Sequence, residues 1–420
     1  MRFGINTIDD FDIRGKTVLL RVDINQPVDK ENGRLKDITR IKGCVPTVTE
    51  LAEKGAKLVI LAHQGSDIEY KNYYHLGLHA GVLCELTGRE VEFVPDVCGP
   101  FAVEKIKTLK DGEILLLDNV RFMAEEMTLF ETKLKLTAEQ QANTQVVSRL
   151  APLADLFVMD AFAAAHRAQP TLMAFQQLLP SAMGRLFEKE YSVLAEILEQ
   201  PKKPLVFVLG GAKIQDAFLM MDKVLGGGIA DKVLAGGLVG NVMLAAKGMD
   251  IGAQSLDFIY KNNLGEYIEK SKQLLSAYCD RIICPVDLAY EDGQRHNISV
   301  SDLPANGLLA DIGDQTIQMF TREIKSARTV FVNGPMGVFE QPLTEKGTHA
   351  VWQALAETKA FTVLGGGDSI AATNKYACED RIGYICTGGG AMVRFLSGEE
   401  LPVVAALKYA AKRFGNDKEK

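Results

Sequence analysis

Residues 361–370 read FTVLGGGDSI, an apolar run that ends in three glycines followed by an aspartate. The run predicts a buried strand. Glycines at its end suit a tight turn, because glycine adopts positive φ without strain. They also suit a backbone that a large anion approaches closely. Asp368 has two interpretations as well, since its carboxylate can cap the next helix or bind Mg²⁺ beside a phosphate.

Other apolar runs in the second half of the chain end in the same way. They read LVFVLGG from residue 205, VLAGG from 233, TVFVNG from 329 and YICTGGG from 384. One Gly-Gly pair is more often a turn than a ligand site, but five such endings favour phosphate held by backbone N–H groups and helix N-termini. Lys213 follows Gly210 and Gly211, where a lysine is either an exposed helix residue or a point charge for phosphate. P-loop and dinucleotide-binding fingerprints are absent from the sequence.

Apolar runs in the first half end instead in charged and polar residues. In open α/β sheets, ligands bind beyond the carboxyl ends of the strands. The pattern therefore predicts a cationic pocket for a small anion. Its candidates are Arg21, Asp23, Asn25, His63, Asp118, Asn119, Arg121, Asp160, His166 and Arg167, with Arg40 at the start of a further helical segment.

The alternation of short apolar runs with helical segments predicts α/β architecture with parallel sheets. A length of 420 residues favours two domains. The different strand endings place the boundary near residues 175–190, with a joining helix over residues 185–200. The sequence thus predicts one half for a small anion and the other for a phosphorylated cofactor.

Composition limits the class of protein. Hydrophobic residues make up 47% and charged residues 24%, as in globular proteins, and a net charge of −7 disfavours a general nucleic-acid binder. The seven cysteines include no C-x-x-C pair, so reduced thiols are expected rather than disulfides or a zinc site. No signal peptide or membrane-spanning run is visible. We expect a cytoplasmic enzyme with no membrane or nucleic-acid partner.

Two further signals have structural explanations beside functional ones. His75 and His79 lie four residues apart, which suits half of a metal site or, more commonly, a partly exposed helix face. Trp352 falls on an amphipathic pattern and is interpreted as packing. No Ser-His-Asp or Cys-His arrangement supports nucleophilic catalysis.

A series of motifs carries a family resemblance. It runs through RVDINQP at residue 21, DITR at 37, AHQG at 62, NVRF at 119, DAFAAAHR at 160, LGGAK at 209, NGPMGVFE at 333, GGGDS at 365 and TGGGA at 387. In this order the motifs resemble the phosphoglycerate kinase family over nearly the whole chain, with closer similarity to its archaeal branch.

The resemblance implies two Rossmann-like domains joined by a hinge helix. Residues 1–180 would bind phosphoglycerate, with the tail 400–420 packing back on them, and residues 185–398 would bind the nucleotide. The implied reaction is reversible transfer of the ATP γ-phosphoryl group to the carboxylate of 3-phosphoglycerate, with hinge closure. That carboxylate is already ionised at neutral pH, so no general base is required. Charge neutralisation and positioning remain as the requirements.

The resemblance also implies roles for individual residues. Arg40, Lys213, Gly388 and Gly389 would act in catalysis. Phosphoglycerate would be held by Asp23, Asn25, Arg40, His63, Arg121, His166 and Arg167. ATP or ADP would be held by Gly211, Ala212, Lys213, Gly236, Gly237, Asn333, Pro335, Glu340, Gly366, Gly367, Asp368 and Ser369, with Asp368 as the Mg²⁺ ligand. A monomer or a small homo-oligomer is expected.

The sequence departs from the family pattern at a few positions. Ser66 stands where the family has a substrate-binding arginine, and Ala217 where it often has a lysine. Asp118 and Met159 are milder changes. Ser66 motivates an alternative, a related enzyme that phosphorylates a different carboxylic acid. A regulatory nucleotide-binding protein and a Rossmann dehydrogenase are further alternatives, disfavoured by the retained Lys213 and Asp368 and by the missing fingerprint.

Overall fold

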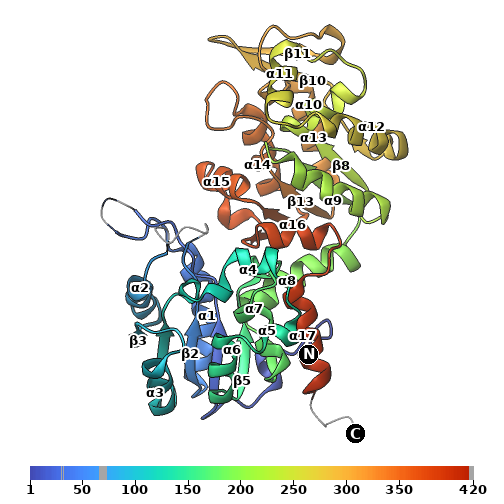
Figure 1. The fold of residues 1–420 in the computed structure, drawn as a ribbon. Helices are drawn as coiled ribbons and strands as arrows, with labels where there is room; N and C mark the ends of the chain where they lie inside the picture. Colours follow the sequence, from blue (N-terminus) through green and yellow to red (C-terminus); the bar gives the residue numbers. More distant parts are fainter. Residues whose placement is uncertain (30, 32, 66–72, 416–420) are drawn as a thin grey trace. The chain divides into compact units, whose positions relative to one another are not determined.

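The computed structural model describes residues 1–29, 31, 33–65 and 73–415 (Figure 1). Ser66 lies outside the described residues. The chain divides into two compact units, unit 1 with Met1–Ser192 and the described part of Glu400–Lys420, and unit 2 with Val193–Glu399. Helix α8 (Arg185–Glu199) runs from one unit into the other, at the position where the sequence predicts a joining helix.

Unit 1 contains a parallel six-stranded sheet with the strand order β3-β4-β2-β1-β5-β6. Out-of-sequence neighbours in a parallel sheet require crossover connections, which the helices between the strands provide. The strands are β1 (Thr17–Arg21), β2 (Lys57–Leu61), β3 (Val91–Val94), β4 (Ile114–Leu117), β5 (Leu156–Met159) and β6 (Ser181–Met183).

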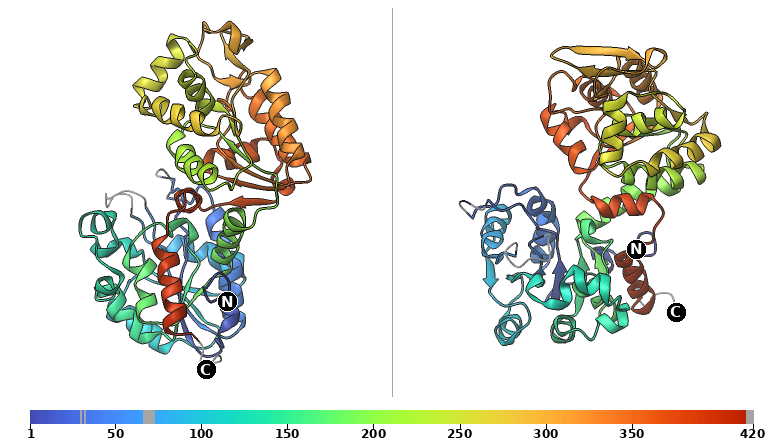
Figure 2. Two further views of the ribbon diagram at one scale, coloured as in Figure 1. Left: turned by 90° about the vertical axis from the view of Figure 1, so that its right-hand side faces the viewer. Right: turned by 45° about the horizontal axis from the view of Figure 1, so that its top comes forward.

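Helices cover both faces of this sheet (Figure 2). The chain returns to unit 1 at its end, where α17 (Pro402–Arg413) contacts β6 and α7. The other helices are α1 (Thr39–Glu53), α2 (Gly77–Thr87), α3 (Pro100–Thr108), α4 (Thr128–Lys133), α5 (Ala138–Gln141), α6 (Gln145–Leu150) and α7 (Pro170–Met173), with short 3₁₀ turns that include η1 (Ile8–Asp10) and η6 (Phe162–Ala164).

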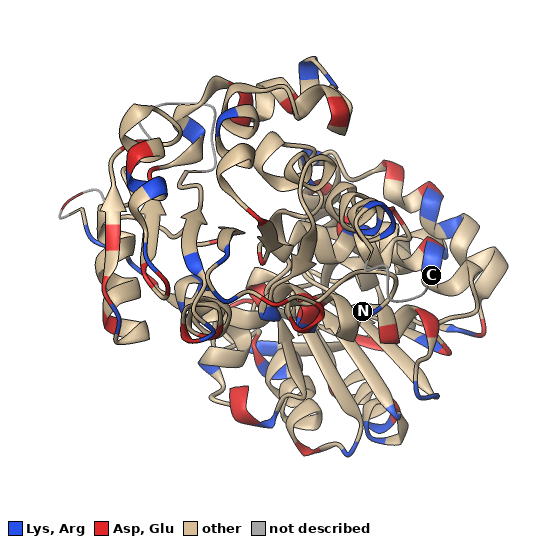
Figure 3. Ribbon diagram, turned by 90° about the horizontal axis from the view of Figure 1, so that it is seen from below, with Lys and Arg blue, Asp and Glu red and all other residues tan. Residues whose placement is uncertain are grey.

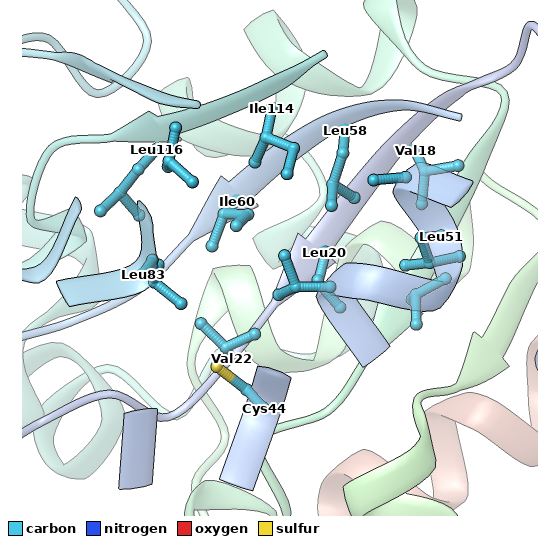
Figure 4. Close-up of a cluster of buried hydrophobic side chains, with 14 of the residues drawn as sticks. Val18, Leu20, Val22, Cys44, Leu51, Leu58, Ile60, Leu83, Ile114 and Leu116 are labelled. Carbon is cyan, nitrogen blue, oxygen red and sulfur yellow. The ribbon is translucent and has the colours of Figure 1, made fainter. Parts of the chain in front are cut away.

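Alternating strand residues form the core on one face of the unit 1 sheet. Val18, Leu20 and Val22 of the β1 segment pack with Leu58 and Ile60 of β2 and with apolar residues of α1 and α2 (Figure 4). The intervening β1 and β2 residues are buried as well, on the opposite face. Burial on both faces explains why these strands are continuous apolar runs in the sequence.

Unit 2 has a second parallel six-stranded sheet, in the order β15-β14-β13-β7-β8-β9. A three-stranded antiparallel sheet, β11-β10-β12, accompanies it. The strands are β7 (Leu205–Leu209), β8 (Lys232–Ala235), β9 (Ile282–Ile283), β10 (Asp287–Glu291), β11 (Arg295–Ser299), β12 (Asp311–Ile312), β13 (Thr329–Asn333), β14 (Phe361–Gly365) and β15 (Tyr384–Cys386).

The helices of unit 2 follow its strands in α/β alternation, which confirms the predicted fold class. Trp352 of α14 is fully buried in the core of this unit, as its interpretation as packing predicts. The helices are α9 (Ile214–Gly226), α10 (Gly237–Ala246), α11 (Ala253–Lys261), α12 (Glu266–Tyr278), α13 (Asp314–Ser326), α14 (Lys346–Glu357), α15 (Gly367–Lys375) and α16 (Gly390–Leu396).

The registers bring the strand ends of each unit to one edge. In unit 1, Arg21 pairs with Leu61 on one side and with Met159 on the other, so the residues after these strands share an edge. In unit 2, Asn333 pairs with Gly365 and with Leu209 in the same way. Each unit therefore gathers its polar or glycine-rich strand ends along one line.

Charged positions are interspersed along the ribbon rather than confined to one segment (Figure 3). Among the described residues, no helix combines the length and apolar character needed to cross a bilayer.

Candidate active site

The edge of unit 1 collects cationic side chains around His63. The ring Nδ1 of His63 lies 3.2 Å from Arg21 Nη2, and Arg21 Nε donates to Thr171 Oγ1 at 3.0 Å. Burial lowers the pKa of His63 well below its usual value, and the charges of Arg21, Arg121, Arg167 and Arg40 lower it further. His63 is therefore neutral at pH 7, surrounded by positive charge.

Arg121 is the least compensated member of this group. Its side chain is 1% exposed, and none of its three guanidinium nitrogens has a hydrogen-bond partner among the described residues. Its Cζ lies 5.9 Å from the centre of the Tyr73 ring. Buried cations are normally paired, because burying an unpaired charge is costly. The arrangement fits an anionic ligand that supplies the missing acceptors.

The other predicted phosphoglycerate residues lie around the same edge. Arg40 donates from Nη1 to Asp23 Oδ2, and Asn25 Oδ1 accepts from the Gly65 N–H at 3.0 Å. Burial and the charge of Arg121 lower the pKa of Arg167, and Arg167 Nη1 lacks a described partner. His166 and Arg167 follow η6 after one intervening residue, Ala165.

The edge of unit 2 forms a small glycine-lined cavity of about 110 Å³. Lys213 and Asp368 supply opposite charges at its wall, and Ser369 Oγ accepts the Gly334 N–H at 2.8 Å. The cavity adjoins the start of α15, whose first N–H groups have no partners within the helix. Predicted residues that line it are Gly211, Lys213, Asn333, Gly366, Gly367, Asp368, Ser369 and Gly389.

A second cavity of about 300 Å³ shares Gly211 and Asp368 with the first. Its walls are largely apolar, and Phe258 and Val338 are each 38% exposed. A glycine-lined cavity that adjoins an apolar one suits a molecule with phosphates at one end and a flat base at the other. Predicted residues that line the larger cavity are Gly211, Ala212, Gly237, Pro335, Glu340 and Asp368.

Two predicted glycines lie outside both cavity linings. A Cβ on Gly236 would lie 2.3 Å from Met336 Sδ, so this glycine permits close packing of the protein itself. Gly388 is buried just before Gly389, the residue with φ +50° that precedes α16. Gly367 differs from both, because a Cβ there would meet nothing within 4 Å.

The structure excludes one of the two interpretations of Asp368. The N-cap of α15 is Gly366, with φ +93°, and Asp368 lies in the first helical turn. The capping interpretation is therefore wrong, because glycine supplies the left-handed backbone at the cap. The Asp368 carboxylate is exposed at the cavity and accepts no described hydrogen bond, so it is available to a ligand.

The structure also corrects the interpretation of His75 and His79 as one helix face. His75 precedes α2 and pairs through Nδ1 with Asp118 Oδ2. His79 is buried within α2, with Nε2 3.0 Å from Gln64 Oε1. Asp118 accordingly has a structural role, since it also accepts the Leu76 N–H at 3.1 Å. Across the described residues, no three His, Cys, Asp or Glu side chains form a metal-binding cluster.

Several cavity residues carry no signal in the sequence. Leu238, Phe258, Leu308 and Leu309 form apolar wall, and Asn241 and Ser255 line the same cavity. Apolar residues of this kind cannot be distinguished from core residues by periodicity. Ala217 is buried in α9, so this position contributes packing rather than the cation that the family often has there.

The residues present fit Mg²⁺ held together with a nucleotide. Mg²⁺ is usually bound by one or two carboxylates plus substrate phosphates. The Asp368 carboxylate lies at the wall of the glycine-lined cavity and accepts no hydrogen bond among the described residues. A single protein carboxylate is sufficient where phosphate oxygens complete the set.

Comparisons with known proteins agree with this geometry. The family model described as Phosphoglycerate kinase matches residues 8–399. Curated proteins with this name include one from Methanothermobacter thermautotrophicus, 44% identical over 407 residues that cover 97% of each chain. Another, from Thermococcus kodakarensis, is 41% identical over 413 residues that cover 97% of this chain and 98% of its own. Both organisms are archaea, in agreement with the closer similarity of the sequence motifs to the archaeal branch of the family.

Solved structures show the same similarity. Phosphoglycerate kinase from Pyrococcus horikoshii superimposes with a TM-score of 0.86 at 40% identity, covering 98% of this chain and all of its own. The enzyme from Coxiella burnetii gives 0.81 at 29% identity, covering 96% and 98%. The alternative acceptor suggested by Ser66 finds no support in these matches. By family model, relatives and fold together, this chain belongs to the phosphoglycerate kinase family.

Proposed function

We propose that this chain transfers the γ-phosphoryl group of ATP to the carboxylate of 3-phosphoglycerate, with each substrate bound by one unit. The observation that carries the assignment is the contrast between the two sheet edges. Unit 1 presents a buried guanidinium that has no hydrogen-bond partner among the described residues and lies among other cations. Unit 2 presents a glycine-lined cavity that shares two lining residues with an apolar one.

Phosphoglycerate is assigned to the cations of unit 1. Its phosphate and carboxylate are both acceptor-only anions, and arginine binds such groups with paired N–H donors. Arg121 and Arg167 have donors there that no described residue accepts. Arg40 is oriented by Asp23, and neutral His63 can donate one N–H without adding charge. Asn25 and His166 complete the proposed set.

The nucleotide is assigned to the two cavities of unit 2. The apolar cavity would take the base, with Glu340 at the ribose, and the smaller cavity would take the phosphates. Asp368 would hold Mg²⁺, which would supply charge neutralisation to the phosphoryl oxygens. Gly366, Gly367 and Ser369 present the N-terminus of α15 to the same phosphates.

Lys213 and Gly389 are assigned to the transferring group. Lys213 is an exposed point charge at the cavity that also contains Gly389. The attacking carboxylate is ionised, so these groups are required to neutralise and orient the phosphoryl group rather than to move a proton. Transfer requires a state in which the two bound substrates come into line.

The test is a coupled assay of the purified chain with Mg-ATP and 3-phosphoglycerate. Lys213→Ala should lower kcat by about 100-fold or more while changing either KM only a few-fold, as for removal of a charge-stabilising donor. Lys272→Ala is the control, because Lys272 is an exposed lysine of the same unit that pairs with Glu269. Unchanged kcat in Lys213→Ala would contradict the proposed role.

We also propose that the chain acts in the cytoplasm on small-molecule substrates, as a monomer. The sequence has seven cysteines and no C-x-x-C pair, which suits a reducing compartment. Light scattering coupled to size-exclusion chromatography tests the oligomeric state, since a mass of two or more chains would contradict the monomer.

A further inference from the structure

The wall of the larger cavity is tied to the antiparallel sheet through Arg295 of β11. Arg295 Nη1 donates to Asp311 Oδ2 at 2.8 Å and to the Leu343 carbonyl oxygen at 3.0 Å, and Nη2 donates to the Ile312 carbonyl oxygen at 2.8 Å. The Arg295 side chain is 15% exposed and the Asp311 side chain is fully buried. One planar guanidinium thereby joins β11, β12 and the segment before α14.

The Asp311 carboxylate uses its other lone pairs on backbone. Oδ2 also accepts the Gly347 N–H of α14 at 2.8 Å, and Oδ1 accepts the N–H of Ile312 at 2.9 Å. Both oxygens are therefore committed within the protein. Asp311 cannot serve as a ligand for a nucleotide without breaking these bonds, so its role is to hold other segments.

The segment that carries Glu340 approaches the same carboxylate. A Cβ on Gly337 would lie 2.7 Å from Asp311 Oδ1 and 2.3 Å from the Ala310 carbonyl oxygen, so only glycine fits there. Val338 N–H donates to that carbonyl oxygen at 2.8 Å. The stretch from Gly337 to Glu340 is therefore seated directly on residues 310 and 311.

Both of these segments line the larger cavity. Residues 308–311 form one part of its lining, and residues 337–340 form another. The close contact between Gly337 and Asp311 sets the distance between these two parts of the lining. A change in the position of the Asp311 carboxylate would displace both parts of the lining at once.

We propose that Arg295 and Asp311 are positioning residues for the nucleotide: their ion pair fixes the spacing between the 308–311 and 337–340 segments and so sets the affinity for the nucleoside. This inference rests on the proposed assignment of the nucleotide to this cavity. If the pair were only structural, its loss would lower the stability of the protein and would affect the binding of both substrates alike. A positioning pair alters nucleotide binding and leaves phosphoglycerate binding unchanged.

The test compares Arg295→Lys with Arg281→Lys in the full chain. Lysine keeps the charge but cannot reach the three oxygens at once. Arg281 is the matched control, because it also holds two backbone carbonyl oxygens of unit 2, those of Leu225 and Ala230, and does not line the cavity. The readouts are the Kd for ADP by calorimetry, the KM values for ATP and 3-phosphoglycerate, and the melting temperature.

Arg295→Lys should raise the Kd for ADP and the KM for ATP roughly tenfold, because displacement of the 308–311 and 337–340 segments weakens the contacts of both cavity walls with the nucleotide. The KM for 3-phosphoglycerate should stay within about twofold, and Arg281→Lys should leave all three constants unchanged. Unaltered ADP affinity in Arg295→Lys, or equal weakening of both substrates, would overturn the inference.

A third variant distinguishes an error in the positioning role of Arg295 and Asp311 from an error in the proposed nucleotide site. Ala212→Trp adds a bulky side chain at the wall of the same cavity. If it binds ADP as tightly as the unsubstituted chain, the proposed nucleotide site is wrong, and the inference falls with it. If it loses ADP binding while Arg295→Lys retains full affinity, the site stands and only the positioning role is overturned.

Discussion

Arg121 allows a test in which stability and binding change in opposite directions. Its guanidinium is buried without a described hydrogen-bond partner. Arg121→Met should therefore leave the ligand-free protein equally stable or more stable by about 1–3 kcal/mol. The same variant should lose the increase in melting temperature that 3-phosphoglycerate gives to the unsubstituted chain. Thermal unfolding with and without 3-phosphoglycerate measures both effects.

Arg21→Met is the control for that experiment. Arg21 is equally buried, but it donates to Thr171 and contacts His63. Its removal should destabilise the ligand-free protein, since partners are left unpaired. Equal destabilisation by both variants would show that Arg121 is compensated within the protein, and would contradict its role as an anion receptor.

Gly367 provides a similar test on the nucleotide side. A Cβ at this position meets no atom within 4 Å, and no positive φ requires glycine there. Gly367→Ala should thus stabilise α15 by about 0.5–1 kcal/mol. It should nevertheless weaken ADP binding, because the methyl group would project where the phosphates are proposed to lie. Calorimetric titration with Mg-ADP and thermal unfolding measure the two effects.

Gly81→Ala is the matched control, since Gly81 in α2 also has nothing within 4 Å and lies in unit 1. It should give the same stabilisation with unchanged ADP affinity. ADP affinity that is unchanged in Gly367→Ala would remove Gly367 from the proposed phosphate site.

Residues of these two kinds could be predicted from the sequence because they follow apolar runs directly. Arg121 comes four residues after β4, and Gly367 two residues after β14. Arg295, Asp311 and Leu309 could not be predicted, because their roles depend on contacts between segments distant in the chain. The capping interpretation of Asp368 failed for a local reason, since Gly366, two residues earlier, supplies the backbone conformation at the helix cap.

At the scale of elements, two sets of polar contacts fix the start of α8: a carboxylate that accepts its first N–H groups, and an arginine of the helix that binds carboxylates of other elements. Asp160, after β5, accepts the N–H groups of Leu186 at 2.9 Å and Phe187 at 3.1 Å. Arg185 binds Glu50 of α1 through Nε and Nη2 at 2.7 and 2.6 Å, and also binds Asp9 of η1. These bonds hold the first turn of α8 within unit 1, which explains why the unit boundary falls inside the helix at residues 192 and 193.

Asp160 should make stability fall as the pH rises. Burial raises the pKa of Asp160 to about 6, whereas an aspartate in an unfolded chain titrates near about 4. The folded state holds the proton more tightly, so this contribution is full below about pH 4 and is lost as the pH passes about 6. Asp160→Asn keeps the acceptor oxygen and cannot ionise. The free energy of unfolding of Asp160→Asn, relative to that of the unsubstituted chain, should therefore increase between pH 4 and pH 7 by up to about 3 kcal/mol. Melting temperatures of the two proteins across this pH range measure the difference.

Glu50→Gln should show the reverse dependence. The hydrogen bonds from Arg185 lower the pKa of Glu50 to about 2, so its contribution is present above about pH 4.5 and is lost as the pH falls toward 2. The variant should be destabilised at neutral pH and should approach the stability of the unsubstituted chain on acidification.

The Asp160 prediction has a clear contrary outcome. A difference in unfolding free energy between Asp160→Asn and the unsubstituted chain that is constant with pH would show that Asp160 remains ionised when folded.

The parallel strands, and the polar or glycine residues that follow them, could be predicted from the sequence, because burial on both faces of a sheet leaves continuous apolar runs. The antiparallel sheet β11-β10-β12 could not. β11 (RHNIS) contains no buried residue, β10 (DLAYE) begins with an aspartate, and β12 has only two residues. Because these segments are not apolar runs, hydrophobic periodicity does not identify them, and this sheet is the one that supplies Arg295.

For the whole molecule, the proposed division of labour predicts which unit each substrate protects. Amide exchange of the full chain with 3-phosphoglycerate alone should slow at residues 21–25, 62–65 and 119–122, where the cations of unit 1 gather. Mg-ADP alone should slow exchange at residues 210–213, 334–340 and 366–369. Ligands reduce local opening by the free energy of binding to the closed form, so saturating ligand should reduce exchange at its own site by about 100-fold at 100 times Kd.

The Arg121→Met and Gly367→Ala variants make this pattern a test of the assignment rather than of ligand binding in general. Arg121→Met should abolish protection by 3-phosphoglycerate and retain protection by Mg-ADP, and Gly367→Ala should do the opposite. Protection of unit 1 segments by Mg-ADP alone would contradict the assignment, because the anion receptor would then be occupied by nucleotide phosphate. Separate protection by each ligand, with loss confined to the matching variant, follows only if the cationic edge and the glycine edge bind different substrates.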